Sequence, residues 1–202
     1  MECSGTTTRG RPREFDPDVA LTAALRVFWQ RGYEGASMAE LTEAMGITKP
    51  SLYACFGNKE ALFRKALDLY ETEKLCYVGI ALQAPTARGV AEALLRGAIQ
   101  THCGESDPQG CLGVISSVAC GTEAEAIRQE VIARRTSSER AVVERFERAR
   151  DEGDLPADAD PEGLATYLMT VLQGLSIKAG SGATREALDR IVTTAIACWP
   201  SA

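Results

Sequence analysis

The stretch from Ser37 to Phe63 constrains the fold most strongly, because it holds three helix starts and two tight turns within 27 residues. Ser37, followed three residues later by a glutamate, is a capping box that opens a helix. Gly46, whose backbone tolerates positive φ, ends this first helix. Thr48 then caps a second helix, in which the proline two residues later stands where its missing amide costs nothing. The stretch therefore predicts a helix–turn–helix.

The second of these helices separates into an apolar face and a polar face. Leu52 and Phe56 are four residues apart, so they share one face, which we expect to be buried. Hydroxyl and cationic groups occupy the other faces, namely Thr48, Lys49, Ser51 and Tyr53. A short helix of this kind suits the major groove of DNA, where such groups reach phosphates and base edges. A helical corner with a solvated polar face is the alternative interpretation.

The charge distribution is compatible with a nucleic-acid partner although the net charge is −6. Residues 1–65 carry nine Lys and Arg against eight Asp and Glu, whereas the rest of the chain carries 13 against 20. Arg9, Arg11 and Arg13 come just before the first helix. A basic arm of this kind can bind phosphates or a minor groove, and a solubilising tail is the alternative.

Length and composition indicate an ordinary globular protein. The chain has 202 residues, of which 45% are hydrophobic, so it can build a core. It contains no run of about 18 apolar residues and no apolar signal peptide, so we expect a cytoplasmic protein with no membrane partner. Seven cysteines without the spacing of a disulfide scaffold indicate reduced thiols.

Helical periodicity runs along the chain without a convincing strand pattern, so we predict an all-α fold of about nine helices. Asp16 opens the first helix and Gly32 ends it. From Asn58 the pattern continues to about Val78, which predicts one helix of some 20 residues, about 30 Å long, as a lever between two domains. The predicted divisions are a flexible basic arm (1–15), a helix–turn–helix domain (16–63), and a ligand-sensing and dimerisation domain (64–202).

Further helix signals fill the second domain. A short helix is predicted from Cys111 to Cys120, and Thr122 opens a long helix that ends near Glu152. The charged stretch in the middle of that long helix is interpreted as a solvated face. The last two helices carry broad apolar faces, which either widen the core or pack on a second copy. The apolar residues in question are Leu164, Leu168, Leu172, Leu175, Leu188, Ile191 and Ala195.

The N-terminal third resembles the DNA-binding domain of the TetR/AcrR family of transcriptional regulators. The resemblance covers GRPREF and VFWQRGYEGASMAELTEAMGITKPSLYACFGNKEALFRKAL, roughly Gly10 to Tyr70. It rests on Phe28, Gly32, Ser37, Gly46, Leu52, Tyr53, Phe56, Lys59 and Phe63. A looser resemblance, in GCLG from Gly110 and GLSIKAGSGATREAL from Gly174, is to the ligand-binding domain of one branch of the family.

The resemblance implies a homodimeric regulator, a repressor by analogy with the family, that binds palindromic double-stranded operator DNA. It also implies that the two C-terminal helices form a four-helix dimer interface, and that the protein is not an enzyme and needs no cofactor. The predicted DNA contacts are Arg13, Ser37, Thr48, Lys49, Ser51, Tyr53 and Lys59, with Ser37 and Lys59 holding phosphates at helix starts.

Cys111 is a candidate sensor of oxidants or electrophiles. It follows a glycine at the apparent start of a helix, where unpaired amides favour a thiolate. The matching cysteine in the resembling branch looks like one that some members use for sensing. Lys178, in the facing segment, could lower the pKa of the thiol or trap the oxidised sulfur. Small buried cysteines and a surface lysine are the alternative.

The second domain carries other candidate signals. His102, Cys103 and Cys111 could supply metal ligands, but one histidine and no CxxC make this a weak pattern. A disulfide switch among Cys103, Cys111 and Cys120 is a further hypothesis. A small-molecule pocket is predicted among residues that could equally be plain core, namely Leu94, Ile99, His102, Ile115, Tyr167 and Val171.

Two other function classes remain open at this point. An enzyme with Cys111 as nucleophile is disfavoured, because the lone His102 has no recognisable partner to orient it as a base. A helical interaction module whose head does not bind DNA would be marked by salt-insensitive behaviour and no retention on DNA.

Overall fold

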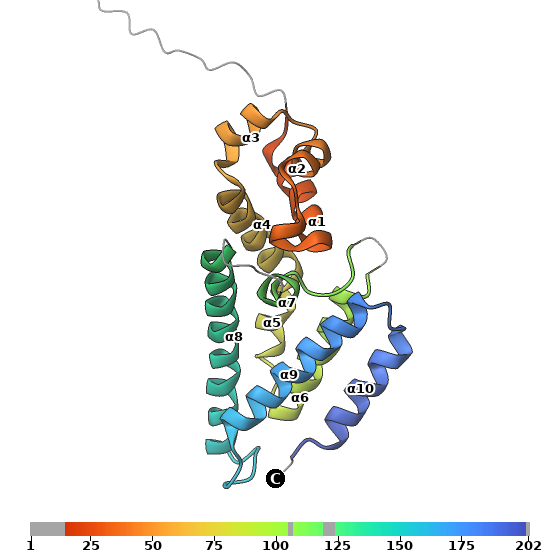
Figure 1. Ribbon diagram of the computed structural model, residues 1–202. Coiled ribbons are helices and arrows are strands. Elements are labelled where there is room, and N and C mark those ends of the chain that lie inside the picture. Colours follow the sequence, from red (N-terminus) through yellow and green to blue (C-terminus); the bar gives the residue numbers. More distant parts are fainter. Residues whose placement is uncertain (1–14, 105–106, 119–123, 201–202) are drawn as a thin grey trace, which may run out of the picture.

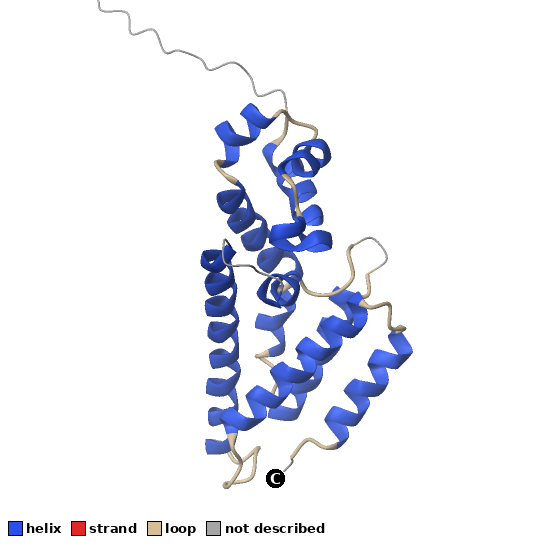
Figure 2. Ribbon diagram, in the orientation of Figure 1, coloured by secondary structure: helices blue, strands red, loops and turns tan. Residues whose placement is uncertain are grey.

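The computed structural model describes residues 15–104, 107–118 and 124–200, and these form ten helices. Every regular element of the described part is helical, as Figure 2 shows, which confirms the all-α prediction. Helices α1–α4 make a head at one end of the molecule, and α5–α10 make a second domain beneath it (Figure 1).

The head begins with the helices that the capping signals predicted. They are α1 (Pro17–Gly35), α2 (Met38–Met45) and α3 (Lys49–Phe56). Ser37 makes both bonds of its capping box, and Thr48 accepts the Ser51 amide at the start of α3. Gly46 adopts φ 64° between α2 and α3, which only glycine does without strain. The helix–turn–helix is therefore confirmed at the level of its backbone.

Aromatic side chains close the core of the head. The ring of Phe28 packs edge-on against Phe63, with centroids 5.1 Å apart, and both rings are fully buried. Trp29 packs instead against Tyr70, with centroids 4.8 Å apart. Leu112, Ile127 and Val131, which come from the second domain, belong to the same apolar cluster. The core of the head thus continues into the second domain.

The single lever helix predicted from Asn58 to about Val78 is wrong in its length. It is divided into α4 (Lys59–Lys74) and α5 (Cys76–Ala81), and this division accounts for the tenth helix. The backbone leaves the helical conformation at Leu75, with φ −104° and ψ 6°. The hydroxyl of Thr101 donates to the carbonyl of Lys74 at 3.3 Å, and the turn brings the Tyr77 ring onto the backbone of Gly97. The break therefore depends on contacts with a distant helix.

The second domain is built around α9 (Pro161–Gly180), which packs on both α6 (Ala87–His102) and α8 (Glu125–Asp151) (Figure 1). Helix α10 (Arg185–Ala197) packs on α6 and α9, while α7 (Leu112–Val118) bridges to α1. No helix in the described ranges is both long and apolar enough to cross a membrane.

Two predicted helix boundaries in this domain need correction or lie outside the description. Helix α8 starts at Glu125 after Ala124, with no capping side chain, so it begins later than predicted. Thr122, the predicted cap, and Cys120, the predicted end of the short helix, lie outside the described residues.

The contact between Tyr77 and Gly97 gives a test of the α5–α6 packing. A Cβ at Gly97 would lie 2.2 Å from the ring of Tyr77, so the ring must move. We expect Gly97→Ala to lower the free energy of unfolding by about 1–3 kcal/mol through overpacking, measured by urea denaturation. Gly79→Ala, where nothing lies within 4 Å, is the matched control and should not destabilise. Equal stability of the two variants would contradict the packing.

Candidate nucleic-acid interface and sensor cavity

Helix α3 turns its predicted polar face outward. Leu52 is fully buried and Phe56 is 5% exposed, so both anchor α3 to the head. Tyr53 is 48% exposed, and Thr48 and Lys49 are also exposed. The hydroxyls of Thr48 and Ser51 lie 2.9 Å apart, so each fixes the orientation of the other. The structure thus presents Thr48, Lys49 and Tyr53 exposed at one helix, with Ser51 partly buried beside Thr48.

The two helix starts predicted to hold phosphates differ. Ser37 is exposed but uses its hydroxyl to accept the amide of Glu40 at 3.1 Å. The ammonium of Lys59 lies 4.6 Å from the centre of the Tyr33 ring and donates to the carbonyl of Glu34 at 3.4 Å. Desolvation in this position lowers the pKa of Lys59. The side chain of Lys59 therefore already links the start of α4 to the end of α1.

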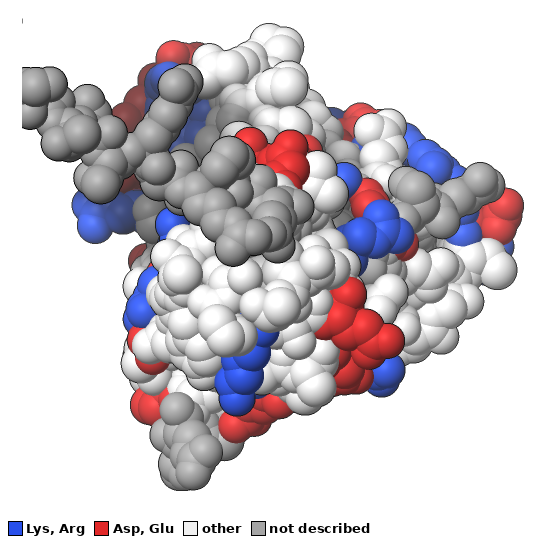
Figure 3. Space-filling view, turned by 90° about the horizontal axis from the view of Figure 1, so that it is seen from above, with Lys and Arg blue, Asp and Glu red and all other residues white. Residues whose placement is uncertain are grey.

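Charge on the head end is scattered. Figure 3 looks down on this end and shows basic and acidic side chains in small groups around uncharged surface. Arg13, predicted to aid phosphate binding, lies outside the described residues, as do Arg9 and Arg11. The exposed groups that α3 offers are the hydroxyl of Thr48, the ammonium of Lys49 and the phenol of Tyr53.

A cavity of about 120 Å³ lies inside the second domain, bounded by helices α4 to α9. Its walls are mostly apolar, with polar groups at a few places. Of the predicted pocket residues, Leu94 and His102 line this cavity. The complete lining is Leu67, Tyr70, Glu71, Leu75, Tyr77, Val78, Leu94, His102, Cys111, Gly113, Val114, Val131, Arg134, Arg135, Ser138, Val142, Met169, Leu172, Gln173 and Ser176.

The other predicted pocket residues lie elsewhere. Ile99 is buried in the apolar core of the second domain. Ile115 lines a separate hollow beside Trp29, between the head and α9. Tyr167 and Val171 line a groove between α9 and α10. These four residues therefore lie outside the cavity, because helical periodicity identifies a buried or apolar face without saying what that face packs against.

His102 is almost completely buried, at 2% exposure, and its Nδ1 has no hydrogen-bond partner among the described residues. Desolvation lowers the pKa of the imidazole to about 4, against a hydrogen bond to the backbone of Gly110 that acts in the opposite direction. His102 is thus neutral at physiological pH and offers an unpartnered polar atom at the cavity.

Cys111 lines both the cavity and the hollow beside Trp29. The hydroxyl of Tyr70 lies against the thiol, and burial raises the pKa of that phenol far above its usual value. Lys178 is exposed and lines the groove between α9 and α10. The two residues of the predicted sensor pair therefore border different spaces.

Neither a metal site nor a disulfide is formed by the described residues. No group of three or more His, Cys, Asp and Glu side chains is placed to hold a metal ion there. Cys103 and Cys111 are both free thiols, whereas Cys120 lies outside the described ranges.

A buried hydrogen bond joins the head to the segment that carries Cys111. The indole N–H of Trp29 donates to the carbonyl of Gly110 at 2.8 Å. Gly110 adopts φ 88°, and a Cβ there would lie 3.1 Å from the carbonyl oxygen of Ser176. Helices α1 and α9 and the residue before Cys111 thus meet at one point that requires glycine.

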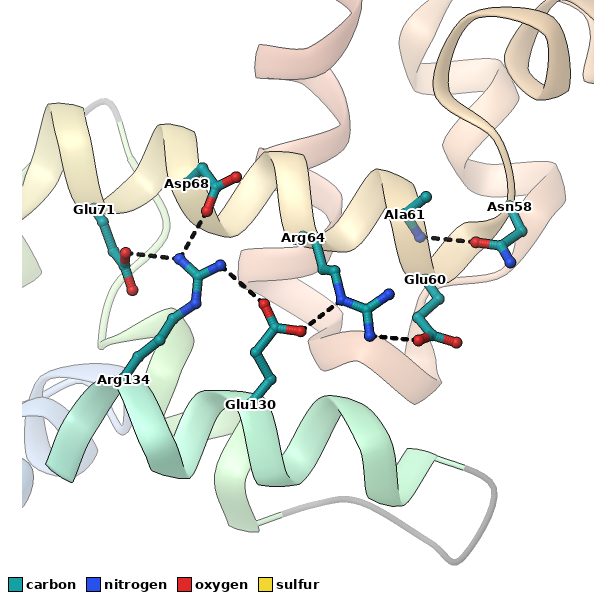
Figure 4. A network of polar contacts seen from close by, with 8 residues as sticks. All are labelled: Asn58, Glu60, Ala61, Arg64, Asp68, Glu71, Glu130 and Arg134. Carbon is teal, nitrogen blue, oxygen red and sulfur yellow. Dashed lines mark hydrogen bonds and ion pairs between the residues drawn. The ribbon is translucent and has the colours of Figure 1, made fainter. Parts of the chain in front are cut away.

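Ion pairs form a second connection between the head and the second domain (Figure 4). Arg134 of α8 binds Asp68 at 2.7 Å and Glu71 at 2.8 Å, both on α4, and Glu130 on its own helix at 2.9 Å. Glu130 also binds Arg64, so the cluster runs along one side of α4. The sequence pattern assigned this stretch of α8 to a solvated face, so it missed the cluster.

The predicted dimer residues lie mostly on the inward side of α9 and α10. Leu168, Leu175, Leu188 and Ala195 are at most 3% exposed and belong to the core of the second domain. Leu164, Leu172 and Ile191 are partly buried against that core. The accessible side of α9 and α10 carries other residues, including Tyr167 at 44% and Ile177 at 57% exposure. The apolar periodicity of the sequence thus identified the side of α9 and α10 that faces the core of their own domain.

Comparison with known proteins identifies the fold and the family. Residues 20–66 match the family described as bacterial regulatory proteins, tetR family, and residues 91–195 match the tetracyclin repressor-like C-terminal domain. The HTH-type transcriptional repressor ComR of Escherichia coli (strain K12) is 34% identical over 201 residues, covering 96% of this chain and 93% of ComR. This chain belongs to the TetR family.

Two further TetR relatives bear on DNA binding. The HTH-type transcriptional repressor BdcR of Escherichia coli (strain K12) is 29% identical, covering 89% of this chain and 86% of BdcR. A cysteine mutant of the TetR family regulator CifR, solved in complex with 26-bp double-strand operator DNA, is 47% identical with a TM-score of 0.90, covering 94% of this chain and all of that one.

The protein is therefore a TetR-family DNA-binding transcriptional regulator, and its relatives are repressors. Since the family and these relatives are regulators rather than enzymes, the comparisons confirm the expectation that the protein is not an enzyme. The resemblance of the GCLG segment to a thiol-sensing branch stays a prediction.

The buried His102 predicts a pH dependence of stability. Its pKa falls from 6.5 when unfolded to about 4 in the fold, so protonation favours the unfolded chain. The stability that the fold keeps while His102 is neutral is fully present above about pH 6.5 and is lost as the pH falls toward 4. Between pH 7 and 4.5 we expect wild type to lose about 2 kcal/mol more than His102→Leu, measured by urea unfolding. Parallel pH profiles for the two proteins would rule out a buried neutral imidazole.

Proposed function

We propose that this TetR-family regulator is a cytoplasmic homodimeric repressor whose α3 reads a palindromic operator. The observation that carries the proposal is the exposed face of α3, where Thr48, Lys49, Ser51 and Tyr53 project from a helix whose other side is buried. Lys49 and the hydroxyls suit phosphates and base edges, and the phenol of Tyr53 adds reach. The complex of the related CifR with operator DNA supports the same role for the head.

Helices α9 and α10 are proposed as the dimer interface. Their accessible sides flank a groove lined by Tyr167, Val171, Ala187, Ile191 and Thr194, and Ile177 is exposed nearby. Large apolar side chains left in water favour burial against a second copy. Two-fold pairing through these helices would present two copies of α3, as a palindromic operator requires.

A signal in the second domain is proposed to release the operator. The two candidate signals are a small molecule in the cavity and modification of Cys111, which borders that cavity. Either one acts only if it favours one position of the head over another. The hydrogen bond from Trp29 to Gly110 and the ion pairs of Arg134 with α4 are the connections through which the head would respond.

Substitution of Tyr53 tests the assignment of the reading helix. Because Tyr53 is 48% exposed and lies outside the buried core, Tyr53→Ala should leave stability and dimerisation nearly unchanged. It should weaken operator binding by about 1–3 kcal/mol, roughly 5- to 150-fold, in fluorescence anisotropy with DNA from upstream of the gene.

Ile80→Ala serves as the control for Tyr53→Ala, because Ile80 is 73% exposed on α5 of the second domain. It should bind the operator as wild type does. Unchanged affinity for Tyr53→Ala would refute the role of α3, and equal losses in both variants would point to a general destabilisation.

Cys111→Ser tests the thiol as a signal. Hydrogen peroxide oxidises a reactive thiol to a sulfenic acid, which is larger and more polar. Beside Tyr70 and the cavity, this change should disturb the Gly110 junction and weaken operator binding in wild type, while Cys111→Ser should keep its affinity. Cys76→Ser, which removes an exposed thiol, is the control and should remain sensitive. Peroxide-sensitive binding in Cys111→Ser would exclude Cys111 as the sensor.

A further inference from the structure

Two neighbouring arginines of α8 border the cavity, and they differ in how their charges are satisfied. Arg134 is surrounded by carboxylates, since it pairs with Asp68, Glu71 and Glu130. Arg135 is partly buried, and its only contact given by the structure is a hydrogen bond from Nη1 to the hydroxyl of Ser117 at 2.9 Å. Within the described ranges, Arg135 has no carboxylate partner.

Among the residues that line the cavity, Arg135 is thus a positive group without an acidic partner in the described ranges. The only carboxylate in the lining is Glu71, and Arg134 neutralises it. The imidazole of His102 is neutral at physiological pH because its pKa is about 4. A guanidinium beside an apolar space and without an acidic partner attracts an anion, which it can bind with two parallel hydrogen bonds.

The size and walls of the cavity limit the rest of the ligand. Its volume is about 120 Å³, close to the ~150 Å³ of an apolar protein cavity that holds one benzene molecule. Leu67, Val78, Val114 and Met169 contribute apolar surface. His102, whose side chain is only 2% exposed and whose Nδ1 has no partner among the described residues, also lines the cavity.

We propose that the cavity binds a small organic carboxylate, about one ring or one short branched chain in size, with its carboxylate on Arg135. The apolar body fills the space between α4 and α9, and a hydroxyl or a water bound with the ligand reaches His102. This inference rests on the proposed function and gives its small-molecule signal a chemical class.

The position of Arg134 explains how such a ligand loosens the head. Arg134 lines the same cavity, so the carboxylate of the ligand competes with Asp68 and Glu71 for its charge. These two residues are on α4, the helix that directly follows the helix–turn–helix. Binding thus weakens the attachment of α4 to α8 and favours a head position that no longer fits the operator.

Isothermal titration calorimetry with benzoate and its neutral isostere benzamide tests the proposal on the full chain. Wild type should bind benzoate at least tenfold more tightly than benzamide. Arg135→Gln should lose this preference. Arg140→Gln is the matched control, because Arg140 lies on the same helix but its side chain is 80% exposed and paired with Glu144; it should behave as wild type.

A second variant fills the cavity and leaves the charge of Arg135 in place. A Cβ at Gly113 meets only the sulfur of Cys111, at 3.8 Å, and the backbone there is helical. Gly113→Leu should therefore fold, fill part of the cavity and abolish binding of benzoate and benzamide alike. Equal affinities of wild type for the two compounds, no benzoate binding, or unaltered binding by Arg135→Gln or Gly113→Leu would overturn the proposal.

Operator binding measured in parallel separates this inference from the function on which it rests. Benzoate should weaken operator binding by wild type and not by Arg135→Gln. Tight operator binding that benzoate leaves unchanged would overturn the carboxylate signal alone. Absence of operator binding in every protein would instead refute the repressor function.

Discussion

The hydrogen bond from Trp29 to Gly110 is the constraint on which the position of the head relative to the second domain depends. It is buried, 2.8 Å long, and joins residues 81 positions apart. A buried indole N–H without a partner costs about 1–3 kcal/mol, so the head keeps this contact in its resting position. Gly110 can supply the carbonyl only because it lacks a side chain, since the carbonyl oxygen of Ser176 lies beside its Cα. The fold thus brings the head, the start of α7 and the end of α9 to one place.

Two kinds of attachment hold the head, and they differ in how easily a signal can change them. The apolar attachment includes Leu112 and Val131, which are buried with the head residues, and breaking it would expose hydrophobic surface. The ion pairs of Arg134 with Asp68 and Glu71 lie nearer the surface, where each pair contributes little and competing charges screen it. A signal that rearranges the ion pairs and pivots the head on its apolar contacts costs less than one that separates the domains.

The sequence allowed the head to be predicted almost completely because its signals are local. The caps at Ser37 and Thr48 and the turn at Gly46 act within four residues, and the structure has all three. The end of α4 was missed because it depends on Thr101 and Gly97, which lie on another helix. The same limit applies to the candidate site: periodicity located the apolar faces of α9 and α10, but only the packing of the whole domain decides that Leu168 is core and Tyr167 is surface.

The two adjacent arginines of α8 show most simply why the sequence alone does not predict the site. Successive residues of an α-helix point about 100° apart, so two adjacent arginines meet different surroundings. Arg134 reaches the acidic side of α4, whereas Arg135 turns toward Ser117 of α7. In the sequence they are equivalent charges on a polar stretch. The difference arises because the two side chains meet different neighbouring helices, α4 for Arg134 and α7 for Arg135. The chemistry of the cavity is therefore a consequence of the tertiary fold.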